Sequence, residues 1–325
     1  MAKINYRWAI TNALDEEMAR DDKVFIIGED VAETGGSFGL TRGLLAKYGE
    51  RRVKDTPVSE EAIAGLGVGA AAVGLRPVIE IMFMDFIYLA MDQIANHAAK
   101  MRYMYGGQVN IPLVVRTLAG GGFRTGMHHS QSLESMFGHV PGLKVVYPSN
   151  AYDVKGLLKS AIRDPDPVIF LEQKSLMSLK EEIPEAEYLI PIGKGKIVKE
   201  GSDVTIVALG SMVHLAKEAA RTLEKKGINV EIIDPRTVMP IDSQLIIESL
   251  KKTSRLVIVH EAPAPFGFGS EIAALISEHA LYYLDAPIKR VTSKFVPLPV
   301  GRGEDYILPS EEKLIAAVEQ VMKGE

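Results

Sequence analysis

Short apolar runs alternate with helical patterns along most of this chain, and this alternation restricts its fold more than any other feature. In the first half, apolar runs predict strands at residues 24–27, 52–56, 77–83, 111–116, 143–147 and 168–171. Helical patterns lie between most of them and include a long helix at 85–105 and a helix at 151–163. Strands that alternate with helices pair in parallel, and the helices cover both faces of the sheet. The sequence therefore predicts an α/β fold built on a parallel sheet.

A second unit of the same kind follows. Strands are predicted at residues 204–209, 230–234, 256–260 and 288–292, and they alternate with helices at 212–226, 243–251, 268–280 and from 311 onward. The sequence between these two regions is rich in charge and punctuated by proline, which is typical of a connection. We therefore predict two α/β domains, at residues 1–180 and 201–325, joined by a connection at 181–200.

Composition excludes several classes of function. The 325 residues carry a net charge of −5 and no block of lysine and arginine, which argues against nucleic acid or a membrane as partner. The chain has no cysteine, so disulfides and thiolate catalysis are excluded. No apolar run reaches the 18 to 20 or so residues of a membrane span, and the first residues lack the apolar core of a secretory signal. We expect a cytoplasmic protein.

The segment 55–74 holds the first candidate for a functional residue. Pro57 ends a strand, Ser59 is a good helix N-cap, and Glu60 and Glu61 open the helix. Residues 62–74 include no charged residue, so the helix is expected to be buried on nearly every side, with Glu60 at its entrance. Acidic residues in a first helical turn also complement the helix dipole, and this structural role is the alternative for both.

The same helix carries a loose match to a dinucleotide-binding fingerprint. Gly65, Gly67 and Ala70 fit G-x-G-x-x-A, but the fingerprint belongs on the turn between strand and helix. Here it begins about five residues inside the helix. We favour the view that these small residues let two helices approach closely.

A second candidate is the loop at residues 117–131. It has three consecutive glycines, which let a backbone approach a ligand closely, followed by His128 and His129. A histidine can transfer protons near neutral pH, although both could equally be hydrogen-bonded loop residues. Adjacent histidines without a nearby carboxylate make a poor metal site. Ser130 beside His129 raises a serine-hydrolase alternative, which we do not favour.

Several motifs, taken together and in order, resemble one family. They are GEDV at 28–31, DTPVSE at 55–60, GLRP at 74–77, DF at 85–86, HSQSLE at 129–134, the segment 141–164 and HEAP at 260–263. The chain resembles, over essentially its whole length, the β subunit of the E1 component of thiamine diphosphate-dependent 2-oxo acid dehydrogenase complexes, including the acetoin dehydrogenase branch.

The resemblance implies a fold, a cofactor and roles for particular residues. The first domain would be a pyrimidine-binding domain and the second a transketolase C-terminal domain. Glu60 matches the glutamate that hydrogen-bonds N1′ of the aminopyrimidine of thiamine diphosphate, and Val58, Met82 and Phe86 match residues that pack around that ring. His129 matches a histidine near the reacting centre, expected to orient substrate or assist acyl transfer, whereas no role is carried over to His128.

Some relatives also bind a potassium ion. The matching positions are Leu113, Ala161, Ile162, Asp164 and Asp166, mainly through backbone carbonyls. Oxygen ligands suit a hard cation.

The resemblance also implies partners. The family assembles as two α and two β subunits and transfers an acyl group to a lipoyl-bearing acyltransferase, E2. The G-D-G segment that anchors Mg²⁺ and the diphosphate in this family does not occur in the 325 residues. We therefore predict that an E1 α subunit holds Mg²⁺ and the diphosphate, and that this chain alone is inactive.

Two other functions stay open. The chain could be half of another thiamine diphosphate enzyme, such as a split transketolase or a deoxyxylulose-phosphate synthase, or a non-catalytic scaffold that docks the acyltransferase core. Within the E1 family, pyruvate, acetoin and branched-chain 2-oxo acids are all open as substrates.

Overall fold

The computed structural model describes residues 2–325, which divide into two compact units. The first comprises the described part of Met1–Ala119 together with Met136–Ile192, and the second comprises Gly120–Ser135 with Gly193–Glu325. The loop carrying the two histidines thus belongs to the second unit. A division of the sequence into two continuous domains cannot describe this, because the loop is separated from the rest of its unit by residues 136–192. The limits 1–180 and 201–325 stay a prediction for the family domains.

The sheet of the first unit has the order β6-β7-β5-β4-β2-β3, and every neighbouring pair is parallel. Its strands are β2 (Val24–Gly28), β3 (Val53–Asp55), β4 (Arg76–Phe83), β5 (Val114–Ala119), β6 (Lys144–Val146) and β7 (Val168–Gln173). A separate antiparallel pair joins β1 (Ala2–Asn5) to β8 (Lys180–Ile183). The parallel α/β fold predicted from the alternation is confirmed.

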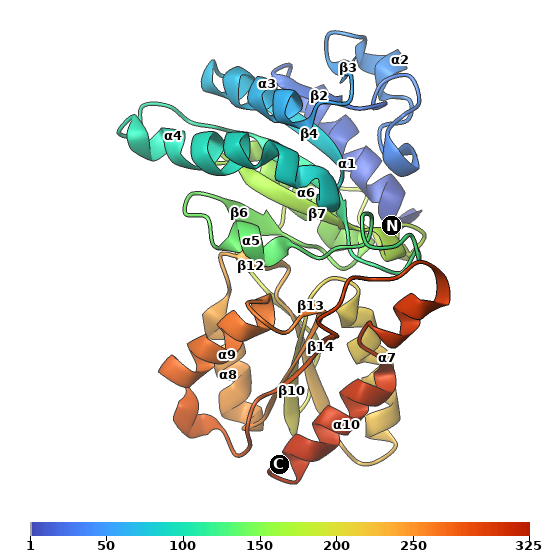
Figure 1. Cartoon of the computed structure of the whole chain (residues 1–325), viewed down its shortest axis with the longest axis vertical. Coiled ribbons are helices and arrows are strands. Elements are labelled where there is room, and N and C mark those ends of the chain that lie inside the picture. Colours follow the sequence, from blue (N-terminus) through green and yellow to red (C-terminus); the bar gives the residue numbers. More distant parts are fainter. Residues whose placement is uncertain (1) are drawn as a thin grey trace. The chain divides into compact units, whose positions relative to one another are not determined.

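Helical segments flank this sheet (Figure 1). They are α1 (Tyr6–Arg20), η1 (Ser37–Gly39), α2 (Leu44–Tyr48), α3 (Glu60–Ala72), η2 (Met84–Ala90), η3 (Asp92–Ala98), α4 (Ala99–Met104), α5 (Glu134–Gly138), α6 (Ala151–Arg163) and η4 (Lys174–Leu176). Residues 85–105, which the sequence suggests form one long helix, instead pass from 3-10 through π to α geometry.

Alternation along β4 shows which helices cover which face. Val78 packs in the core with α1 and α6, whereas its neighbour Ile79 points to the opposite face, where α3 lies. A Cβ atom at Gly67 of α3 would come within 2.8 Å of Ile79 and 3.0 Å of Leu113. Glycine at this position therefore allows α3 to lie directly on the sheet.

The prediction that α3 is buried on nearly every side is wrong for the single chain. Ile63, Ala64 and Val68 are buried, but Leu66 is 57% exposed, and Val73 at the end of the helix is 81% exposed. The absence of charge between residues 62 and 74 therefore does not reflect burial within this chain. An uncharged, exposed face is typical of a surface that contacts another molecule.

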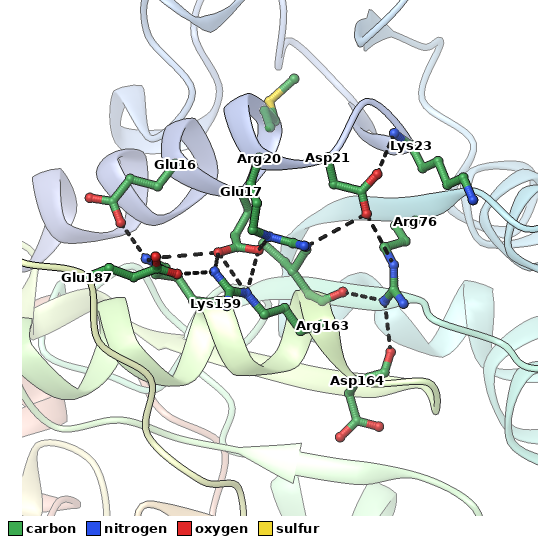
Figure 2. Close-up of polar contacts among 12 residues, drawn as sticks. Glu16, Glu17, Arg20, Asp21, Lys23, Arg76, Lys159, Arg163, Asp164 and Glu187 are labelled. Carbon is green, nitrogen blue, oxygen red and sulfur yellow. Dashed lines mark hydrogen bonds and ion pairs between the residues drawn. The ribbon is translucent and has the colours of Figure 1, made fainter.

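An ion-pair cluster joins α1 to α6 on the other face (Figure 2). The carboxylate of Glu17 is fully buried and accepts hydrogen bonds from Arg163, with Nη2–Oε1 at 2.7 Å, and from Arg20, with Nε–Oε2 at 2.7 Å. Lys159 of α6 pairs with Glu16 of α1 at 2.6 Å. A buried carboxylate is tolerated only when cations and hydrogen bonds compensate it, and here both helices supply them.

A second buried cluster lies among the strands. Arg116 of β5 is fully buried and donates to both oxygens of Glu172 at 2.7 and 3.1 Å and to Glu80 at 3.1 Å. Glu80 also accepts the backbone N–H of Ser37 at 3.2 Å. Burial raises the pKa of Glu172 to about 7, although the positive charge of Arg116 acts in the opposite direction.

This raised pKa gives a testable pH dependence. Because the folded-state pKa lies above the ordinary value of 4.5, folding favours the protonated acid. Its stabilising contribution is fully present below pH 4.5 and is lost as the pH rises through about 7. We expect Glu172→Gln to weaken the fall in the free energy of unfolding between these pH values, as measured by urea titrations. An unchanged pH profile in the variant would contradict this assignment.

The second unit repeats the α/β architecture. Its sheet has the order β14-β13-β10-β11-β9, parallel except for β9. The elements are β9 (Lys196–Lys199), β10 (Val204–Ala208), α7 (Met212–Glu224), β11 (Val230–Asp234), β12 (Thr237–Met239), α8 (Ser243–Thr253), β13 (Leu256–Pro263), α9 (Phe268–His279), η5 (Leu281–Tyr283), β14 (Lys289–Ser293), η6 (Gly301–Tyr306) and α10 (Glu311–Met322).

Two side-chain layers fill this unit. Helices α7 and α10 pack on the face that carries Ile206 and Val257, while α8 and α9 lie on the face that carries Thr205 and Ile258.

Among the helices of residues 2–325, none combines the length and apolar character that crossing a membrane requires.

Candidate functional site

Glu60 is the first residue of α3 and is only 7% exposed. It follows β3, so it lies where a strand of the parallel sheet ends and a helix begins. Ligands of open parallel α/β sheets bind beyond the carboxyl ends of the strands. Ser59 precedes the helix as predicted, but its hydroxyl makes no capping hydrogen bond. The helix instead begins with the backbone bond from Ile63 N–H to the Ser59 carbonyl.

Glu29 accompanies Glu60 at this edge. It follows β2, the strand beside β3, and accepts a hydrogen bond from the backbone of Ser59. Burial raises the pKa of Glu29, and the nearby charge of Glu60 raises it further. A carboxyl group whose pKa is raised in this way is a candidate for proton transfer at this edge. In the sequence, Glu29 was marked only by its place at a predicted strand end and within the motif GEDV at 28–31, and no role was predicted for it.

The apolar residues predicted to surround the cofactor ring come from two connections at the same edge. Val58 precedes α3 and is 78% exposed, while Met82 is the last but one residue of β4 and is half-buried. Phe86 lies in η2, where its ring meets Phe83 edge-on at 5.8 Å between centroids. Helix α3 packs against η2, so these residues and Glu60 come from neighbouring elements.

The residues of the first unit therefore fit an aminopyrimidine in chemical character. Glu60 offers a shielded carboxyl group to a ring nitrogen, and Met82 and Phe86 offer partly exposed apolar surface to the ring faces. The assignment of these residues to the cofactor stays a prediction.

The histidine loop, residues 120–135 of the second unit, contains hydrogen bonds between its own residues. Gly120 N–H donates to the carbonyl of Gln131 at 3.0 Å, and Thr125 Oγ1 lies 3.1 Å from the hydroxyl of Ser130. His129 is half-buried, and its N–H donates to the Gly126 carbonyl at 3.2 Å. The loop is therefore an ordered part of this unit.

A cavity of about 560 Å³ borders this loop. His128, which is exposed, lines it together with Met127, Leu133 and apolar residues of the segment 293–298. No role was predicted for His128, and its place on the cavity wall could not be predicted because residues 293–298 lie far away along the chain.

The five residues predicted to bind potassium are partly engaged with the chain itself. The carbonyl of Ile162 accepts from Arg76 at 2.8 Å, and that of Leu113 accepts from Val168 N–H at 2.9 Å. The Asp164 carboxylate accepts from Lys144 at 2.7 Å. The other two are also bonded: Ala161 O accepts from Asp164 N–H at 3.2 Å, and the Asp166 carboxylate accepts from Arg102 and Lys144.

A carbonyl oxygen has two lone pairs, so these bonds leave room for a cation at each carbonyl. The oxygen donor set is chemically suitable for potassium. Potassium binding stays a prediction.

The serine-hydrolase alternative gains nothing from the structure. A literal G-x-S-x-G does occur at residues 35–39, with Ser37 at its centre. Ser37 begins η1, within the loop between β2 and α2, rather than a strand-to-helix turn. A nucleophile elbow requires that turn.

Comparison with known families defines the class of protein. Residues 2–180 match the family model "Transketolase, pyrimidine binding domain", and residues 193–314 match "Transketolase, C-terminal domain". A solved split-gene transketolase, described as an inactive β4 tetramer, is 26% identical, with a TM-score of 0.81 and 99% of each chain covered. A transketolase from Pichia stipitis is 17% identical with a TM-score of 0.72; 99% of this chain and 46% of that one are covered, and this likeness shows the fold alone.

Curated relatives narrow the class further. The β subunit of pyruvate dehydrogenase E1 from Rickettsia felis is 49% identical, over 98% of each chain. The β subunit of acetoin:2,6-dichlorophenolindophenol oxidoreductase from Cupriavidus necator is 46% identical, over 99% of this chain and 98% of that one. The β subunit of 2-oxoisovalerate dehydrogenase from Bacillus subtilis is 46% identical, over 99% of each. The chain therefore belongs to the family of E1 β subunits of 2-oxo acid and acetoin dehydrogenases, which confirms the predicted family and the transketolase-like fold.

Proposed function

We propose that this chain, together with an E1 α subunit, cleaves a 2-oxo acid or acetoin with thiamine diphosphate and passes the acyl group to a lipoyl-bearing E2. The observation that carries the proposal is the shielded carboxyl of Glu60 at the carboxyl edge of the sheet, with Met82 and Phe86 on β4 and η2, two elements that pack against α3. When bound, thiamine diphosphate supplies the nucleophilic carbon that attacks the substrate carbonyl.

The residues of this chain would bind and activate that cofactor. Glu60 would hydrogen-bond N1′ of the aminopyrimidine and hold or release a proton there, and its charge contributes to the raised pKa of Glu29. Val58, Met82 and Phe86 would pack against the ring and keep water from it. His129 would orient the substrate or assist the acyl transfer.

An α subunit would complete the enzyme by holding the diphosphate and Mg²⁺, in a heterotetramer of two α and two β chains. Exposed apolar side chains support a partner for the first unit: Leu66 on α3, Tyr88 and Leu89 on η2, and Tyr103 and Met104 on α4. Helix α3 packs against both η2 and η3, so the exposed residues of α3 and η2 come from adjoining elements. Apolar surface of this kind is typical of subunit interfaces.

Reconstitution tests the proposal. We expect no dye reduction by this chain alone, and substrate-dependent reduction of 2,6-dichlorophenolindophenol after a cognate E1 α subunit, Mg²⁺ and thiamine diphosphate are added. Pyruvate, acetoin and 2-oxoisovalerate (3-methyl-2-oxobutanoate) are to be compared side by side, because the relatives described above are named for these three compounds. Full activity without a second subunit would contradict the proposal, and transfer of a two-carbon unit between sugar phosphates would favour the split-transketolase alternative.

Potassium binding forms a separate proposal for Leu113, Ala161, Ile162, Asp164 and Asp166. Ala161, Ile162, Asp164 and Asp166 lie in the last turn of α6 or just after it, and Leu113 directly precedes β5. We expect KCl to raise the midpoint of thermal unfolding more than NaCl at equal ionic strength. Equal midpoints in the two salts would contradict the site.

A further inference from the structure

The glycine-rich start of the histidine loop is held by two buried carboxylates. Gly121 N–H donates to Glu261 Oε1 at 2.5 Å, and Gly122 N–H donates to Glu304 Oε1 at 2.6 Å. Glu261 is 7% exposed and Glu304 only 1%. Charge-assisted hydrogen bonds of this kind are stronger than neutral ones, and more so when shielded from water.

Glycine is needed where the backbone meets these carboxylates. A Cβ atom at Gly121 would lie 3.3 Å from Glu304 Oε1 and 3.2 Å from Leu308, and Gly122 has a φ of +95°. The three glycines were predicted to let the backbone approach a ligand closely, and that stays a prediction. Two of the groups that it approaches are carboxylates of the chain itself.

Residues from β13 hold the loop at both of its ends. Glu261 also accepts from Ser211 at 2.9 Å and from Ser132 at 3.4 Å, so it touches the start and the later part of the loop. Its neighbour His260 bonds through Nε2 to Glu134, and both side chains are almost fully buried. One strand of the second unit thus anchors the loop before and after His129.

We propose that Glu304, Glu261 and His260 are positioning residues for His129, through the loop that they anchor; this inference rests on the catalytic role proposed above for His129. Hydrogen bonds inside the loop, from His129 N–H to Gly126 and from Thr125 Oγ1 to the His129 carbonyl, link the anchored backbone to the histidine. Displacing a catalytic group by about 1 Å can cost roughly a hundredfold in rate.

Glu304 allows the cleanest test because a neighbouring residue serves as control. We expect Glu304→Ala to lower kcat of the reconstituted enzyme about ten- to hundredfold, with the Kd for thiamine diphosphate unchanged. Glu304→Gln keeps an acceptor oxygen for Gly122 and should recover most of the rate. Asp305 lies on the same turn as Glu304 and forms an exposed ion pair with Arg124. Asp305→Asn should change kcat less than about twofold.

A double variant distinguishes positioning from a general loss of structure. If Glu304 acts through His129, then Glu304→Ala should have almost no further effect in a His129→Ala background. Equal losses in both backgrounds, or wild-type kcat in Glu304→Ala, would overturn the proposal.

Hydrogen exchange of the complex supplies a readout that does not depend on activity. The amides of Gly121 and Gly122 should exchange slowly in the wild type and in Asp305→Asn, and faster in Glu304→Ala. Slow exchange in all three would overturn the anchoring. If the reconstituted wild type turns over none of the three substrates, the proposed function fails while the anchoring is still decided by exchange.

Discussion

Replacing Glu60 by glutamine should lower the activity of the reconstituted enzyme by about a hundredfold or more, while the chain stays folded. Glutamine has nearly the same shape, so packing at the start of α3 is kept, but it cannot hold and release a proton at a ring nitrogen. Positioned acids and bases contribute roughly 10²- to 10⁴-fold to a rate. The measurements are kcat with the dye acceptor and the midpoint of thermal unfolding.

Glu61→Gln is the matched control for this substitution. Glu61 is the next residue and carries the same charge in the same first helical turn, but it is exposed. If both acids merely complement the helix dipole, the two variants should behave alike. Full activity of Glu60→Gln would favour the non-catalytic scaffold and remove the basis of the proposed mechanism.

Replacing Arg116 by methionine should destabilise the chain by about 3 to 5 kcal/mol. The guanidinium is fully buried and bonds to Glu80 and Glu172, so its loss leaves two carboxylates without a counter-charge. A buried, uncompensated charge is among the few causes of effects of this size. Urea unfolding followed by circular dichroism measures the loss.

Two controls separate the buried charge from the change in shape. Arg102→Met removes an arginine whose pair with Asp166 is exposed, and we expect little change in the urea midpoint. In the second control, Glu80→Gln and Glu172→Gln accompany Arg116→Met and remove both carboxylates as well. It should recover part of the stability, because the uncompensated charges are then gone. A urea midpoint for Arg116→Met alone that equals that of the wild type would show that the triad does not stabilise the fold.

Much of the fold was predictable because it depends on local patterns. Residues 151–163 form α6 with the bounds that the sequence predicts, since Asn150 is an N-cap that accepts from Asp153 N–H. The strands of the parallel sheets appear within a few residues of the apolar runs that predict them. Glu60 also stands at the start of its helix as predicted.

Other features depend on residues far apart in the sequence and were missed. The antiparallel pairing of β1 with β8 joins segments about 180 residues apart, and neither carries a long apolar run. The exposed face of α3 was predicted to be buried. A helix without charged residues has the same sequence pattern whether its own chain or another molecule covers it.

The sequence by itself determined the α/β alternation, the family, and the acid at the entrance to α3, since each follows from local periodicity or from a short contiguous motif. Only the tertiary structure decided that Glu261 and Glu304 anchor the glycines before His129, and that Arg116 lies between two carboxylates. These contacts span from 36 to 182 residues. A buried charge finds its partner through the fold, and no pattern within either segment specifies which partner that is.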